Sequence, residues 1–178
     1  CQTDDRATAQ QPASAGKLMD GALAISVSTE ATEQAVAAAM SVMIPAFPPE
    51  YGEAWSAQQL CSMMRLPGAQ LMIGRLDGQP VGFALLRSIA GEAELLLLAV
   101  HPGHRGLGYG KRLLDRCMTE AEAGGAQAMF LEVRRGNPAL RLYNKAGFIQ
   151  YNVRRDYYTG SNGQRTDALS LKIILGRD

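Results

Sequence analysis

The feature that most constrains the fold is an apolar run that leads directly into a glycine-rich loop. Residues 95–100 are continuously apolar, which suits a buried strand but is far too short for a membrane span. Pro102 ends this strand, and three glycines precede the helix that follows: Gly106, Gly108 and Gly110. Glycine lets backbone N–H groups approach a ligand closely, and a helix N-terminus attracts anions. The pattern therefore predicts a pyrophosphate site in a strand–loop–helix unit.

The residues around the loop narrow the choice of pyrophosphate ligand. A Walker A loop would need Gly at position 105 and Ser or Thr at position 112, but this chain has Arg105 and Arg112. The dinucleotide fingerprint G-x-G-x-x-G matches at its first two glycines and meets Lys111 where the third should stand. Glu132 supplies the acid expected about twenty residues later, so a nucleotide-binding oxidoreductase stays an alternative.

Composition excludes several classes of protein. The 178 residues, 47% hydrophobic and 20% charged, fit one globular domain with a sizeable core. A net charge of +1 gives no long-range field, which argues against a nucleic-acid binder. Three cysteines without regular spacing favour a reducing, cytoplasmic compartment, and the Cys and His pattern suggests no metal site. Residues 1–19 read as a disordered tail or a cloning remnant, and residues 20–178 as the folded domain.

Local signals divide the first half of the chain into elements. Residues 22–28 suit a strand, and apolar residues at helical spacing predict a helix over residues 36–43. Pro45, Pro48 and Pro49 are expected to break that helix. Ser56 and Gln59 form a capping-box pattern, which Trp55 and Leu60 flank as a hydrophobic staple. The staple gives the single Trp a structural role; its loop is alternatively positioned to line a substrate cleft.

The second half predicts a β-loop-α-β unit after a hairpin. Asp77-Gly78 is a hairpin turn signal between two apolar runs. In the helix after the glycine loop, Leu113, Leu114 and Cys117 share one face, so Cys117 is expected to pack in the core. Residues 128–133 form the next buried strand, expected to be parallel to the strand before the loop.

A second informative stretch, N-P-A-L-R-L-Y-N-K-A-G-F, covers residues 137–148. Asn137 suits an N-cap, Pro138 the first helical position and Gly147 the residue after the helix. Together with L-E-V-R before it and R-x-x-G-x-G in the glycine loop, the stretch resembles the acetyl-CoA half of the GNAT acetyltransferases. This resemblance implies an α/β fold: a twisted mixed sheet of about seven strands with helices on both faces.

The resemblance also implies a cofactor site for acetyl-CoA as co-substrate. In GNAT enzymes the end of the strand holds the pantetheine arm through its backbone, the loop holds the pyrophosphate, and an Asn contacts the arm. The corresponding residues here are Leu98, Ala99, Val100, Arg105, Gly106, Leu107, Gly108, Tyr109, Gly110, Lys111 and Asn137.

Within the family, the chain is most similar to RimI, the bacterial ribosomal-protein alanine N-acetyltransferases. The similarity implies Glu132 as general base acting through water and Tyr143 as general acid. Without the resemblance, the sequence favours a surface or salt-bridged strand carboxylate for Glu132, and the spacing fits a core aromatic at Tyr143 equally well. Tyr157 and Tyr158 are implied to line the acceptor site, and as consecutive strand residues they are expected to point to opposite faces. The family usually has Asn where this chain has Asp156.

These residues predict transfer of an acetyl group to the N-terminal α-amine of a peptide or protein, such as a ribosomal protein. Roughly 15% of an α-amine is neutral at pH 7, against about 0.04% of a lysine. One carboxylate acting through water is thus adequate for an N-terminus. The alternatives are a GNAT enzyme for a small amine, such as a polyamine or antibiotic, and a non-catalytic acyl-CoA-binding module. A monomer or weak dimer without nucleic-acid or membrane contacts is expected.

Overall fold

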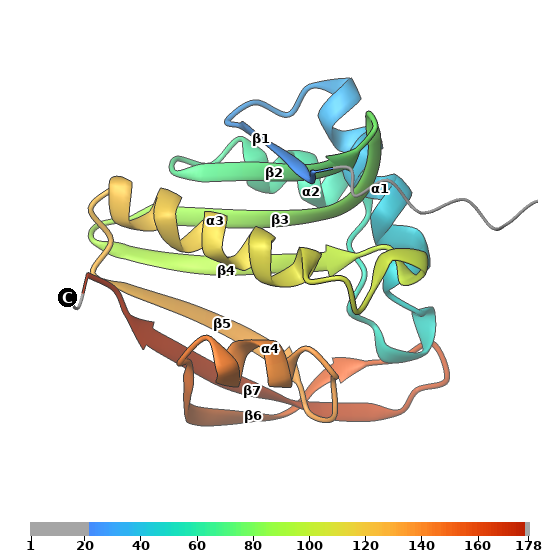
Figure 1. Cartoon of the computed structure of the whole chain (residues 1–178). Helices are drawn as coiled ribbons and strands as arrows, with labels where there is room; N and C mark the ends of the chain where they lie inside the picture. Colours follow the sequence, from blue (N-terminus) through green and yellow to red (C-terminus); the bar gives the residue numbers. More distant parts are fainter. Residues whose placement is uncertain (1–21, 177–178) are drawn as a thin grey trace, which may run out of the picture.

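A seven-stranded sheet with helices on both faces makes up the computed structural model, which describes residues 22–176 (Figure 1). The strand order is β1-β2-β3-β4-β5-β7-β6, with β4 and β5 parallel and every other pair antiparallel. The predicted architecture is confirmed. The elements are β1 (Ala24–Ser28), α1 (Glu33–Ala46), η1 (Pro49–Tyr51), α2 (Ala57–Met64), β2 (Ala69–Leu76), β3 (Gln79–Ile89), β4 (Glu92–Val100), η2 (Pro102–His104), α3 (Tyr109–Ala123), β5 (Ala128–Arg134), α4 (Leu140–Lys145), β6 (Ile149–Thr159) and β7 (Arg165–Ile174).

Several elements follow directly from local sequence. Asp77 and Gly78 both have positive φ, 47° and 81°, as a two-residue turn between β2 and β3 requires. The predicted capping box begins α2: the Gln59 N–H donates to Ser56 Oγ at 3.2 Å, and the Ser56 N–H donates to Gln59 Oε1 at 2.7 Å. Trp55 packs against the same hydrophobic cluster as Leu60, in agreement with a hydrophobic staple.

One helix boundary differs from its prediction. Pro45 lies inside the last turn of α1 and does not break it; the helix ends one residue later, at Ala46. A proline in the last turn removes only one helical hydrogen bond. The Phe47 N–H closes the helix by donating to the Met43 carbonyl at 3.1 Å.

Two hydrophobic cores lie on the two faces of the sheet. The α3 face is filled from the helix by Leu113, Leu114 and Cys117, all fully buried, as the periodicity predicts. Cys117 Sγ lies 3.4 Å from Met72 Sδ, and burial raises the pKa of its thiol to about 12, so it is a packing residue. The opposite face is covered by α1 and α2, through residues that include Val42, Met43 and Leu60.

A β-bulge in β4 separates the two halves of the sheet. Leu85 faces Leu97 and the next residue of β3 faces Leu95, so Leu96 is an extra residue on β4. The extra residue reverses the alternation of side chains: Leu95 packs on the α3 face, whereas Leu97 packs on the α1 and α2 face. Pairing with β5 stops at the same point, because Leu95 opposite Leu131 is the last β4–β5 pair. Figure 1 shows the two strands diverging beyond it, toward the N-terminal end of α3.

The expectations for residues 1–19 lie outside the described residues. Among residues 22–176, no helix has both the length and the apolar character needed to cross a bilayer. The same part of the chain contains no group of three His, Cys, Asp or Glu side chains placed to share a metal ion.

Candidate active site

The end of β4 presents backbone groups to the opening between β4 and β5. The His101 N–H donates to the Val81 carbonyl of the β3 segment at 2.8 Å, and alternation along an antiparallel pair gives Ala99 the same orientation toward β3. The N–H and C=O groups of Leu98 and Val100 therefore face the opening. Of the three residues expected to hold pantetheine, these two are suitably oriented and Ala99 is not.

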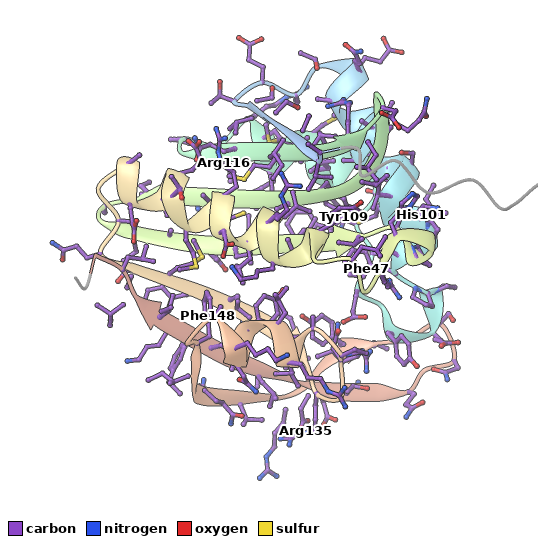
Figure 2. All side chains as sticks on the ribbon, in the orientation of Figure 1. Phe47, His101, Tyr109, Arg116, Arg135 and Phe148 are labelled. Carbon is purple, nitrogen blue, oxygen red and sulfur yellow. The ribbon has the colours of Figure 1, made fainter. Side chains whose placement is uncertain are left out.

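The glycine loop begins α3 with an open backbone surface. Gly106 and Gly108 have φ of 78° and 82°, and a Cβ on either would meet no atom within 4 Å. Gly108 is the N-cap of α3, so the N–H groups of the first helical turn, from Tyr109 to Lys111, have no acceptor within the helix. Figure 2 shows His101 and Tyr109, which flank this loop, at the same end of α3. Leu107 is exposed.

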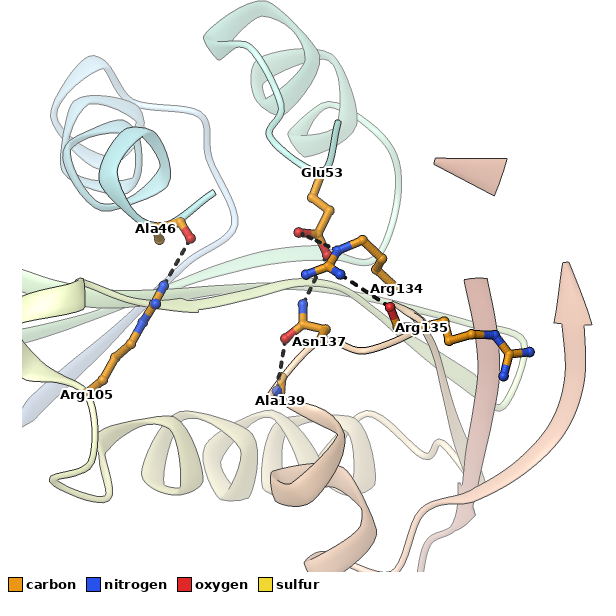
Figure 3. A network of polar contacts seen from close by, with 7 residues as sticks. All are labelled: Ala46, Glu53, Arg105, Arg134, Arg135, Asn137 and Ala139. Carbon is orange, nitrogen blue, oxygen red and sulfur yellow. Dashed lines mark hydrogen bonds and ion pairs between the residues drawn. The ribbon is translucent and has the colours of Figure 1, made fainter. Parts of the chain in front are cut away.

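The cationic side chains near the loop already hold other groups. Arg105 donates to the carbonyls of Val100 and Ala46, at 3.2 and 3.0 Å, and so ties the loop to the end of α1 (Figure 3). Lys111 pairs with Asp115 one turn along α3 at 2.6 Å. Arg112 donates to the Leu23 carbonyl at 2.9 Å. The loop therefore offers an anion mainly its backbone N–H groups.

Gly110 differs from the two preceding glycines. Its φ is not positive, and a Cβ there would lie 3.4 Å from Leu142 Cδ2 and 3.7 Å from a Val100 methyl group. A Cβ at Gly110 would therefore make ordinary van der Waals contacts, and packing does not require glycine at this position.

Glu132 lies on β5 beside the opening, on the face away from α3. Arg154 of β6 donates to its Oε1 at 2.9 Å, and the Ser170 hydroxyl lies 3.5 Å from the same oxygen. The hydrogen bond to Glu132 raises the pKa of the Arg154 guanidinium. On β4, burial and then the nearby Glu132 charge raise the pKa of Glu94. Glu132 thus forms the salt bridge that the sequence suggested, and it also lies one residue beyond the last β4–β5 pair, beside the opening.

Tyr143 is a buried phenol on the first turn of α4. Its ring meets Phe148 edge-on with centroids 5.8 Å apart. Burial raises the pKa of the Tyr143 hydroxyl well above its usual range, and nearby Tyr158 and Glu53 raise it further. The hydroxyl therefore stays protonated at neutral pH.

Asn137 does not cap α4 as its position in the motif predicts. Residues 137–140 form a separate tight turn, in which the Leu140 N–H donates to the Asn137 carbonyl at 3.1 Å, and α4 starts at Leu140. Asn137 Oδ1 accepts from the Ala139 N–H at 2.9 Å within this turn. Its Nδ2 donates to Glu53 Oε1 at 3.0 Å, so the amide expected to contact pantetheine holds a carboxylate (Figure 3).

The prediction that Tyr157 and Tyr158 point to opposite faces is wrong. Their ring centroids are 5.0 Å apart and nearly perpendicular. The register of β6 against β7 jumps from Arg154–Ala168 to Tyr158–Thr166, which inserts two extra residues into β6, and Asp156 has φ of 53°. Asp, like Asn, tolerates this left-handed conformation better than most residues. The bulge turns both rings to one side, which a regular strand cannot do.

Glu53, which the sequence did not indicate, closes the far end of the site. Its Oε2 lies 3.3 Å from Arg134 Nε, and both side chains are about one-tenth exposed. This contact is an ion pair without hydrogen-bond alignment, so Arg134 Nε has no hydrogen-bond acceptor. The Arg134 guanidinium also stacks 3.8 Å above the Tyr51 ring. Glu53 is 81 positions from Arg134, and no local motif marks it.

The loop that carries Tyr51 and Glu53 is seated on the β6–β7 hairpin. The Ser161 N–H donates to the Pro49 carbonyl at 3.1 Å. A Cβ on Gly160 would lie 1.7 Å from the Glu50 carbonyl oxygen, so only glycine permits this contact. The loop is thus joined to the hairpin and, through Glu53 and Arg134, to the end of β5, the strand that also carries Glu132.

Known proteins match both the sequence and this arrangement. The acetyltransferase (GNAT) family matches residues 36–148, which is more than half of the chain. The chain belongs to the GNAT family. It is an N-acetyltransferase with a GNAT fold, as its motifs predict. The alanine N-acetyltransferase of ribosomal protein bS18 from Haemophilus influenzae is 35% identical over 99 residues, covering 56% of this chain and 68% of that protein. The corresponding enzyme of Escherichia coli K12 is 34% identical over 100 residues, covering 56% and 67%.

Solved structures show the same fold. The ribosomal-protein-S18-alanine N-acetyltransferase of Escherichia coli superimposes with a TM-score of 0.73 at 27% identity, covering 87% of this chain and 96% of that one. Ard1 from Thermoplasma volcanium gives a TM-score of 0.71 at 22% identity, covering 86% and 99%, and this likeness concerns the fold alone.

Replacing Arg134 by Met should destabilise this GNAT domain by about 3 kcal/mol, because it leaves the Glu53 carboxylate buried without its cation. The free energy of unfolding from urea titration measures the loss. Adding Glu53→Gln should recover part of the stability, since the remaining buried group is then neutral. Arg135→Met is a matched control: its ion pair with Asp167 is exposed and should contribute less than about 1 kcal/mol. Equal losses for the two arginines would contradict the buried pair.

Proposed function

We propose that the protein transfers the acetyl group of acetyl-CoA to the N-terminal α-amine of a protein, with alanine as the preferred first residue. The similarity to bS18-alanine N-acetyltransferases, of which the chain covers up to 68%, carries this proposal. The bulge that brings the Tyr157 and Tyr158 rings together, beside the loop seated on the β6–β7 hairpin, agrees with it, because two neighbouring phenols would suit the amides of a peptide chain end. The catalytic unit is residues 20–178.

The co-substrate would lie along the opening. The backbone groups of Leu98 and Val100 are oriented to bond the pantetheine amides in the manner of an added strand. The N–H groups between Gly106 and Lys111 suit its pyrophosphate. Asn137 would contact the arm only if its amide left Glu53, so we assign it to the scaffold of the site.

The reaction requires two proton transfers, for which the site has two groups in different environments. The acceptor amine loses a proton, its nitrogen bonds to the thioester carbonyl carbon, and the C–S bond breaks to release a thiolate that takes up a proton. Glu132, which accepts a hydrogen bond from Arg154, would accept the amine proton through water. Tyr143, held as a neutral phenol by burial, would protonate the thiolate. Transfer is then direct, and neither Cys61 nor Cys117 is required.

An acceptor panel tests the proposal. Acetyl-CoA turnover should be measured with peptides that begin with a free Ala, the same peptides with a blocked N-terminus and an internal Lys, and a set of polyamines and aminoglycosides. Only the free-Ala peptides should be acetylated efficiently. Turnover of a small amine at least tenfold above every peptide would overturn the protein-acceptor proposal and leave a small-molecule GNAT enzyme. Binding of CoA without any turnover would indicate a non-catalytic module.

Gly108→Ala should weaken acetyl-CoA binding about tenfold or more, because the methyl group blocks backbone approach to the pyrophosphate. It should also cost about 1 kcal/mol of stability, since φ of 82° is strained for alanine. Gly125→Ala is the matched control, with the same φ and an equally open Cβ position at the other end of α3. Titration calorimetry and thermal unfolding should show similar stability losses for both variants and lost affinity for Gly108→Ala alone. Equal affinities would contradict the phosphate loop.

Glu132→Gln and Tyr143→Phe should each lower kcat by about 10²–10⁴-fold while acetyl-CoA still binds, as expected for a lost proton transfer. The Glu132 variant should recover partly at high pH, where more acceptor amine is already neutral. Glu92→Gln, an exposed carboxylate on the neighbouring strand, is the control and should keep kcat within about threefold of the parent. A loss in Glu132→Gln that does not change with pH would instead indicate a structural carboxylate.

A further inference from the structure

Arg154 reaches Glu132 across an intervening strand. Arg154 lies opposite Ala168 of β7, whereas Glu132 lies opposite Ser170 of the same strand. Both β7 residues are buried and small, so the Arg154 side chain passes over them to its 2.9 Å contact with Glu132 Oε1. Larger residues at these two positions of β7 would separate the pair. The contact thus depends on the residues of three strands.

The β6 bulge, residues 155–157, follows Arg154 directly and is held by Asp167 of β7. The Asp156 N–H donates to Asp167 Oδ1 at 3.1 Å, and Arg135 pairs with the second oxygen of Asp167 at 3.3 Å. The bulge brings the Tyr157 ring under Arg154, with the guanidinium carbon 4.2 Å from the ring centroid. The guanidinium is therefore held between an aromatic ring and a carboxylate.

Among the described residues, Arg154 is the cation that faces Glu132 within ion-pair distance. The other groups that bear on this carboxylate are Ser170 of β7, Glu94 of β4 and Tyr158 of β6. Arg134, two positions along β5, pairs with Glu53 at the far end of the site. Without Arg154, Glu132 would face another carboxylate and a phenol with no cation to offset its charge.

We propose that Arg154 is a positioning residue for catalysis: it orients the Glu132 carboxylate toward the opening while the acceptor amine approaches. The proposal rests on the role of Glu132 in the proposed function. The pair is half-exposed on the Arg154 side, so its contribution to stability is small, and its effect is on proton transfer. A carboxylate held in one orientation meets the amine proton more often than one that rotates freely.

The steady-state kinetics of Arg154→Met test this role. The kcat should fall about tenfold while KM for acetyl-CoA stays at the parent value, because a misoriented base slows proton transfer and leaves the cofactor site intact. Arg154→Lys should restore part of kcat. The control is Arg155→Met, an adjacent exposed cation, which should leave both constants unchanged.

A double substitution separates this inference from the proposed function. In a Glu132→Gln background, Arg154→Met should cause no further loss, because Arg154 acts only through Glu132. If Glu132→Gln is impaired while Arg154→Met has the parent kcat, the positioning role is overturned and the base survives. A raised KM for acetyl-CoA with the parent kcat, or additive losses in the double variant, also overturns it. If Glu132→Gln retains parent activity, the assignment of the base itself fails.

Discussion

One extra residue, Leu96 in β4, determines how the rest of the molecule is arranged. The bulge that it forms reverses the side chains of β4, so Leu95 packs under α3 and Leu97 under α1 and α2. It also coincides with the last β4–β5 pair, beyond which the backbone of β4 has no neighbouring strand on that side. The unpaired groups of Leu98 and Val100 lie next to the N-terminus of α3, so the feature that divides the sheet also creates the proposed acetyl-CoA site.

An opening in a sheet must be spanned by other contacts, and here these are polar and come from distant parts of the chain. Glu53 crosses from the loop after α1 to Arg134 at the end of β5 and to Asn137 before α4. Arg105, by contrast, links the glycine loop to the end of α1 on the β4 side of the opening. A buried ion pair adds little net stability. The Glu53–Arg134 pair does require one geometry, which suits it to fix β5 relative to the α1 side where the β4–β5 pairing has ended.

How much the sequence predicts depends on whether a signal is local. The capping box, the Asp77-Gly78 turn and the buried face of α3 are confirmed, because each depends on residues a few positions apart. The β4 bulge has no signal in the sequence, because residues 95–98 are all leucine and can pack on either face of the sheet. The relative orientation of Tyr157 and Tyr158 was predicted wrongly because it depends on the β6 bulge, and the contact of Asn137 with Glu53 joins residues 84 positions apart. The family was predicted by resemblance, and the roles of Glu132 and Tyr143 stay predictions.

The two proposed catalytic groups lie on different sides of β5. Tyr143 belongs to α4, on the same face as α3, whereas Glu132 lies on the opposite face with Arg154. A base in contact with solvent and a phenol buried in the core differ in the protonation state that each environment favours, as acid–base catalysis at neutral pH requires. In the proposed reaction, deprotonation of the amine and protonation of the thiolate would therefore fall to separate groups on the two faces of β5, and no covalent enzyme intermediate is required.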